Sequence, residues 1–278
     1  MILSAIDLCA LALVALIGLP HGAFDGAVYA LLPDRGAKKR RLLLFLISYS
    51  ALALAIIVLW LLAPLASLVG FLAISAFHFG KGDTEGYHGK ARLVAIVAHG
   101  GLVTIFLPLM HHGEAFAAFA ALTFRPSHEL EILSYILWLA AFAWGTACLI
   151  YGWMSAMNAF YRARFIELIL LCLILAYLPI LAGFALYFCF IHSRRHFVVL
   201  YQSTKSQAPR SLLPLAIGLS CASWMAGALG LILLNQYQSF AVSIIQIIFI
   251  GLAALTVPHM ILVDGLWRPL AKPSFFAR

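Results

Sequence analysis

The chain has 278 residues, of which 64% are hydrophobic and only 10% are charged, and its formal net charge is +8. A soluble globular domain carries about 25% charged residues, so this chain has too few to cover a surface that faces water. The composition therefore excludes an ordinary cytosolic enzyme, an intrinsically disordered chain and a secreted disulfide-rich scaffold. It favours an all-α, polytopic membrane protein, because apolar runs of about 20 residues recur along the sequence.

The apolar runs predict a transmembrane helical bundle of about nine spans, with seven to nine compatible with the pattern, in a single domain over residues 1–278. In chain order, the nine spans are 2–19, 42–62, 65–80, 93–110, 130–152, 165–182, 184–201, 212–234 and 241–263. The two spans between 165 and 201 can also be divided differently.

The basic residues predict the orientation of this bundle. With nine spans, 17 of the 18 Lys and Arg residues fall on one side of the membrane, and only Arg125 falls on the other. The positive-inside rule then places the N-terminus outside and the C-terminus in the cytoplasm. Because topology and attraction to anionic lipid account for the positive charge, we expect no nucleic-acid partner.

Histidines gather at one depth of the predicted bundle. Six of the ten lie in the cytoplasmic halves of five spans: His21, His78, His99, His192, His196 and His259. Ionisable side chains inside a bilayer are costly and usually functional. A shared depth is also what one metal site requires, because histidine ligands must approach a single ion to ~2.0–2.1 Å.

Four of these histidines form the predicted metal site. His192 and His196 are spaced i, i+4, which stacks them on one face of a helix, and His21 and His78 complete a four-imidazole set from neighbouring helices. His99 precedes two glycines, so we expect it to serve helix packing and an interhelical hydrogen bond.

Several further residues are candidates for supporting roles. Two roles are open for His259: it supports a metal ligand, or it serves only helix packing. Asp25, Asp83 and Asp264 each follow one of the histidines by about one helical turn. Asp25 is the best candidate to accept the second ring N–H of a metal-bound imidazole. Asp83 lies in the polar stretch KGDTEG, where we expect a helix cap or a side chain at the aqueous interface.

An all-imidazole ligand set favours iron, zinc or copper over magnesium or calcium. Four neutral ligands on an octahedral ion leave two positions open, which suits iron(II) that binds O2 beside an apolar substrate. A tetrahedral zinc with four protein ligands is instead closed and structural. The aromatic side chains of Tyr187, Phe188 and Phe190 adjoin the histidine pair in sequence and suit a long apolar or polyene ligand.

Several tracts resemble those of the Brp/Blh family of membrane β-carotene 15,15'-dioxygenases. They are GLPHGAFD at 18–25, SAFHFG at 75–80 and YFCFIHSRRHF at 187–197. The tracts AHGG at 98–101 and TVPHM at 256–260 also resemble its Blh branch from marine bacteria. The tracts occur in order over nearly the whole chain, which makes the resemblance specific.

The resemblance implies an Fe(2+) centre held by the histidines that match His21, His78, His192 and His196. It also implies that O2 cleaves the central double bond of β-carotene into two retinal molecules, which are supplied to a retinal-binding opsin. The implied location is the inner membrane of a bacterium. Gly26 and the pair Lys81-Gly82 depart from the family pattern, which puts in doubt only the detail around the ligands.

Two other functions compete with this interpretation. A membrane zinc hydrolase of the ceramidase/progestin-receptor-like type uses a three-histidine zinc with an activated water, and Ser75, three residues before His78, is compatible with it. A non-catalytic carotenoid-binding protein is the second, although it leaves the co-planar histidines unexplained. An opsin is excluded, because every lysine lies in a loop or at the end of a span.

Overall fold

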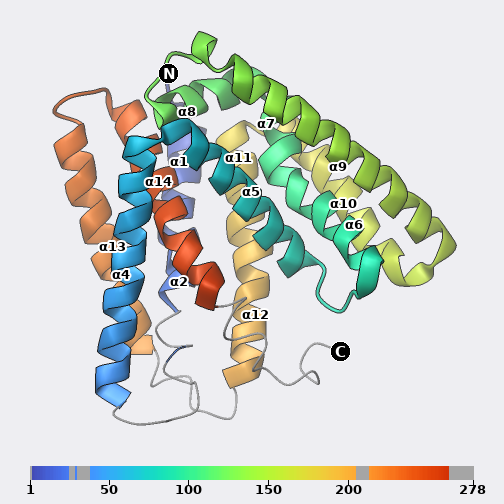
Figure 1. Cartoon of the computed structure of the whole chain (residues 1–278), viewed down its shortest axis with the longest axis horizontal. Coiled ribbons are helices and arrows are strands. Elements are labelled where there is room, and N and C mark those ends of the chain that lie inside the picture. Colours follow the sequence, from blue (N-terminus) through green and yellow to red (C-terminus); the bar gives the residue numbers. More distant parts are fainter. Residues whose placement is uncertain (1, 25–28, 30–37, 205–212, 263–278) are drawn as a thin grey trace. The chain divides into compact units, whose positions relative to one another are not determined.

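The computed structural model describes residues 2–24, 29, 38–204 and 213–262 (Figure 1), and no strand occurs among them. The chain forms two compact units. The first comprises Met1–Leu11 and Leu65–His192, and the second comprises Ala12–Pro64 and Ser193–Arg278. An all-helical fold is thus confirmed for the described residues, and the single domain stays a prediction.

The first unit is a bundle of long helices with short connections. Its elements are α5 (Pro64–Asp83), α6 (Gly89–Gly101), η2 (Leu102–Phe106), α7 (Leu107–Met110), α8 (His112–Thr123), η3 (Ser127–Glu129), α9 (Glu131–Met157), α10 (Ala159–Tyr177), α11 (Ile180–Ala185) and η4 (Leu186–His192), preceded by most of α1 (Ala5–Leu13). Helix α9 packs against both α6 and α10 (Figure 1). Helix α8 has no counterpart among the predicted spans.

Glycines allow α5 and α6 to approach each other closely. A Cβ on Gly80 would collide with the carbonyl oxygen of Ile96, and one on Gly100 would collide with that of Ala76. Small residues at such crossings allow backbones in membrane proteins to pack tightly. The packing expected around Gly100 is therefore confirmed, and it fixes α5, which carries His78, against α6.

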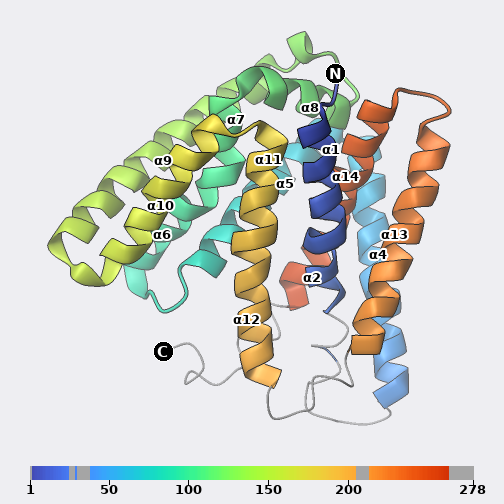
Figure 2. The ribbon, with the colours of Figure 1, turned by 180° about the vertical axis from the view of Figure 1, so that it is seen from behind.

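The second unit is built from helices near both ends of the sequence. It contains η1 (Val14–Gly18), α2 (Pro20–Ala23), α4 (Lys38–Leu62), α12 (Ser193–Thr204), α13 (Leu213–Leu234) and α14 (Phe240–Met260). Helix α14 packs against both α4 and α13, while α13 also contacts the short helix α2 (Figure 2).

One predicted boundary between spans is wrong. The sequence suggested a division near residue 183, but α10 ends at Tyr177 and α11 starts at Ile180. Pro179 explains the break, because a residue before proline is pushed out of the helical region, and Leu178 is indeed extended at ψ 142°. The apolar segment between residues 159 and 204 is therefore divided into two helical parts at this proline.

Six helices of the described residues are long and apolar enough to cross a bilayer. They are Leu42–Leu62, Pro64–Asp83, Gly89–Met110, Glu131–Met157, Leu213–Leu234 and Phe240–Met260. Large apolar side chains project outward along several of them, for example Leu54 and Leu62 of α4, which are 61% and 78% exposed. Such faces suit lipid rather than water, which is consistent with a membrane protein.

Candidate metal centre

Two predicted metal ligands meet inside the first unit. His78 lies on α5 and His192 is the last residue of the π-helical segment η4, and both are at least nine-tenths buried. Their ring centroids are 4.9 Å apart at an interplanar angle of 66°. This separation allows one nitrogen of each ring to approach a common ion at ~2.0–2.1 Å.

Aromatic rings pack around this histidine pair. The ring of Phe79 lies edge-on to His192 at 4.7 Å, to Tyr187 at 5.4 Å and to Phe188 at 6.3 Å. Phe188 also stacks nearly parallel to His192, at 6.0 Å and 9°. These contacts exclude water and hold the His192 ring in one orientation.

Gly82 lies beside the imidazole of His192. A Cβ at this position would lie 3.9 Å from the imidazole, which is ordinary van der Waals contact. The departure from the family pattern at Lys81-Gly82 therefore lies directly beside a predicted ligand.

The expected position of Asp83 at the aqueous interface is wrong, because its side chain is buried. The residue is only 2% exposed, and its Oδ2 accepts a 2.7 Å hydrogen bond from the hydroxyl of Tyr187. The same oxygen lies 3.9 Å from Nδ1 of His99. A buried carboxyl group requires such partners, and here they join α5 to both η4 and α6.

A chain of polar side chains continues from this carboxyl group. His99 Nε2 is 3.5 Å from the hydroxyl of Tyr151, which lies 3.0 Å from the hydroxyl of Tyr87. The interhelical hydrogen bond expected of His99 is thus confirmed. Tyr87 belongs to the turn between α5 and α6. Burial raises the pKa of its hydroxyl above 10.0, and the hydrogen bond to Tyr151 opposes this rise. This network was missed because its members are far apart in sequence.

A second pair of histidines occurs within the second unit. The rings of His196 on α12 and His259 on α14 are 5.2 Å apart at 67°, much like the first pair. His259 directly follows Pro258, which lies inside α14, as His21 follows Pro20 at the start of α2. The His21 side chain, Asp25 and Asp264 lie outside the described residues.

The three predicted substrate contacts differ in their exposure. Tyr187 and Phe188 are buried, whereas Phe190 is 48% exposed. Phe188 also stacks on Phe184 at 5.4 Å. Two of the three therefore belong to the aromatic packing around His192, and the third faces outward.

The donors present suit a transition metal. Each unit holds two imidazoles that lie close together, and imidazole suits zinc, copper and iron rather than magnesium or calcium. Within the described residues of either unit, no three His, Cys, Asp or Glu side chains gather closely enough to hold an ion.

Comparison with known proteins assigns the chain to a family. A family model described as beta-carotene 15,15'-dioxygenase matches residues 12–267. A beta-carotene 15,15'-dioxygenase from uncultured marine bacterium 66A03 is 40% identical over 268 residues, covering 96% of each chain. No solved structure matches the chain. On the extent of both matches, the chain belongs to the beta-carotene 15,15'-dioxygenase family.

Proposed function

We propose that this protein is a non-haem iron(II) dioxygenase that cleaves the central 15,15' double bond of β-carotene with O2, giving two molecules of retinal. The observation that carries the proposal is the buried pair of His78 and His192, in a chain that belongs to this family. The proposed location is the inner membrane of a bacterium, with nine spans, the N-terminus outside and the C-terminus in the cytoplasm. A retinal-binding opsin is the proposed recipient of the product.

The proposed iron ligands are His21, His78, His192 and His196. A ferrous ion held by four neutral imidazoles would supply open coordination positions for O2. We assign His259 and Asp25 to support of the ligands, through the second ring nitrogen of an imidazole. The contact between the rings of His259 and His196 supports this assignment for His259.

The protein's own contribution is a dry, apolar site that orients the substrate. Phe79 and Phe188 cover His192 on the side of η4 and α5, so water has little access to this imidazole. Tyr187, Phe188 and Phe190 are the proposed walls for the polyene. Aromatic faces suit a conjugated hydrocarbon, which offers no group for hydrogen bonding. An apolar substrate of this kind enters from the lipid rather than from water.

The test is to incubate the detergent-purified, iron-replete protein with β-carotene in air and under argon, and to separate the products by chromatography. We expect retinal in air only, since O2 is a substrate. The variant His192→Ala should lose both bound iron and retinal formation. The matched control is His128→Ala, which removes an exposed histidine and should keep both.

Two results would contradict the proposal. Full iron content and full activity in His192→Ala would remove this histidine from the site. Absence of retinal from the iron-replete protein, together with tightly bound zinc, would instead favour the membrane zinc hydrolase, for which ceramide-like amides are the next substrates.

A further inference from the structure

Asp83 is a buried carboxyl group on the helix that carries His78. It is 2% exposed, and no other Asp or Glu is buried in the part of the chain that the structure describes. Asp83 follows His78 by five positions on α5, which is a rise of ~7.5 Å along an α-helix. Ionisable groups inside membrane proteins are costly and usually functional, so the burial of this carboxyl group requires a reason.

Two contacts join α5 to η4 within the first unit. His78 meets His192, with ring centroids 4.9 Å apart, and Asp83 accepts a hydrogen bond from Tyr187. The ring of Phe79 touches both contacts, because it lies edge-on to Tyr187 at 5.4 Å and to His192 at 4.7 Å. One aromatic ring thus connects the tyrosine that holds the carboxyl group to a proposed metal ligand.

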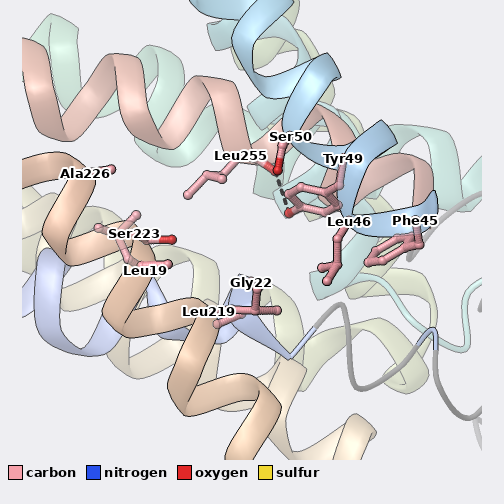
Figure 3. A pocket seen from close by; sticks show the side chains of 12 residues that line it. Leu19, Gly22, Phe45, Leu46, Tyr49, Ser50, Leu219, Ser223, Ala226 and Leu255 are labelled. Carbon is pink, nitrogen blue, oxygen red and sulfur yellow. Dashed lines mark hydrogen bonds between the residues drawn. The ribbon is translucent and has the colours of Figure 1, made fainter. Parts of the chain in front are cut away.

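The hydrogen bond to Asp83 has a length that suits an ionised acceptor. The Tyr187 hydroxyl lies 2.7 Å from Oδ2, and charge-assisted O–H···O⁻ bonds measure ~2.5–2.7 Å. A tyrosine with a neutral acceptor provides a comparison in the second unit. Tyr49, which lies beside Leu255 in Figure 3, donates to the carbonyl oxygen of that residue at 3.2 Å. The shorter bond favours the carboxylate form of Asp83.

Two basic side chains near Asp83 are candidates to balance its charge. Nδ1 of His99 is 3.9 Å from Oδ2, which exceeds the ~3.2 Å limit of an N–H···O bond, and an imidazole balances the charge only when it is protonated. The ammonium group of Lys81 lies 5.7 Å from the ring centroid of Phe77, whose side chain is 47% exposed. A metal ion held by His78 is the third candidate.

The predicted metal centre needs a negative charge. Histidine binds a metal as neutral imidazole, so a four-histidine set leaves both positive charges of Fe(2+) uncompensated. Such a charge is costly in low-dielectric surroundings unless a group of opposite sign lies near it. By Coulomb's law, a unit charge ~10 Å from a divalent ion changes its affinity by more than about a hundredfold at an effective dielectric constant of ~20.

We propose that Asp83 is ionised and supplies the counter-charge to the metal at the predicted centre. The inference rests on the proposed function, which places a divalent ion at His78 and His192. Asp83 has this role without coordinating the metal, because its Oδ2 is held by the hydroxyl of Tyr187. It acts on the ion through its charge alone.

The affinity test uses Co(2+) as the probe, titrated into the full-length, metal-free protein in lipid nanodiscs and followed by its visible absorption. Asp83→Asn keeps an oxygen that accepts the Tyr187 hydrogen bond and removes the charge, so Co(2+) affinity should fall at least ~10-fold. Asp83→Glu restores the charge and should bring the affinity back to within ~3-fold of the wild type. The matched control is Glu129→Gln, which removes a carboxylate that is 48% exposed and should leave the affinity unchanged.

Two further readouts separate charge from packing. In Asp83→Asn the midpoint potential of bound iron should rise, because Fe(3+) loses more Coulomb stabilisation than Fe(2+), whereas a packing defect has no reason to change the potential in this direction. Infrared spectra of the metal-loaded wild type, with isotope-labelled aspartate, need no substitution. Asp83 should absorb there as a carboxylate rather than as a protonated acid. Thermal unfolding shows which variants fold.

The outcomes distinguish this proposal from the proposed reaction. Equal Co(2+) affinity in the wild type and folded Asp83→Asn would overturn the counter-charge, even if the protein forms retinal, and so would an unchanged potential. If neither Asp83 variant folds, a protonated aspartate band in the metal-loaded wild type would overturn it. A loss of affinity in Asp83→Asn that Asp83→Glu restores, in a protein that forms no retinal, would support the counter-charge and contradict the proposed reaction.

Discussion

Replacing Tyr187 by phenylalanine tests the polar connection between α5 and η4. The change removes one hydroxyl group, which donates the 2.7 Å hydrogen bond to Asp83. Both residues are at most 2% exposed, so water cannot replace the lost donor. The aromatic ring remains, and with it the edge-on contact to Phe79 at 5.4 Å.

The expected loss follows from these contacts. A buried acceptor that loses its donor costs ~1–3 kcal/mol. His99 lies 3.9 Å from the same oxygen, and this polar neighbour keeps the loss within that range. We therefore expect Tyr187→Phe to lower the free energy of unfolding by ~1–3 kcal/mol while the iron content stays near that of the wild type.

The assay is reversible unfolding in mixed detergent micelles, followed by circular dichroism, with iron measured on the same samples. The control is Tyr177→Phe, which removes an equivalent hydroxyl from a residue that is 88% exposed and should change stability by less than ~0.5 kcal/mol. If both variants unfold at the same detergent composition, the bond between Tyr187 and Asp83 does not stabilise the fold.

Three other changes have definite expected results. Gly100→Val should destabilise the protein by about 3 kcal/mol, the upper end for overpacking, because its side chain meets the backbone carbonyl of Ala76; thermal unfolding measures it. Burial raises the Tyr87 pKa above 10.0, so the free energy of unfolding should be constant below about pH 10 and fall above it. Tyr87→Phe should flatten this fall. Unfolding measured at a series of pH values on both sides of about pH 10 tests both expectations. His259→Ala should weaken iron binding ~10–100-fold, whereas His99→Ala should retain iron, as metal titration will show.

A specific result would contradict each of these predictions. Gly113→Ala is the control for Gly100→Val, because no described atom lies within 4 Å of the position that a Cβ of Gly113 would occupy; equal stability of the two variants would contradict close packing at Gly100. A fall above pH 10 that persists in Tyr87→Phe would show that another group titrates. Unchanged iron affinity in His259→Ala would leave this histidine with a packing role.

The helical class and the proximity of His78 to His192 were predictable from the sequence. Long apolar runs determine the helical class. The common depth of His78 and His192 in the predicted bundle indicated that they lie near each other. The spacing of His192 and His196 suggested a local pair, yet each contacts a histidine from a distant helix. Spacing along one helix defines a face, but the residue that meets this face depends on tertiary packing.

The role of Asp83 could not be predicted from its neighbours. It lies in a polar stretch that resembles an interfacial turn, and its burial depends on Tyr187, which is 104 residues away. The break at Pro179 was missed for a different reason. Apolar residues continue on both sides of this proline, so hydropathy alone gives no signal there.

The π-helical form of η4 makes His192 sensitive to the length of the chain before it. A π-helix has wider i→i+5 turns, and one surplus residue in an α-helix is enough to create such a turn. Deleting one residue between Leu186 and His192 would return the segment to α-helical winding, which turns by ~100° per residue. The imidazole would then point away from His78, although every predicted ligand would still be present. The number of residues in this helical segment is thus as important to the site as the identity of its histidine.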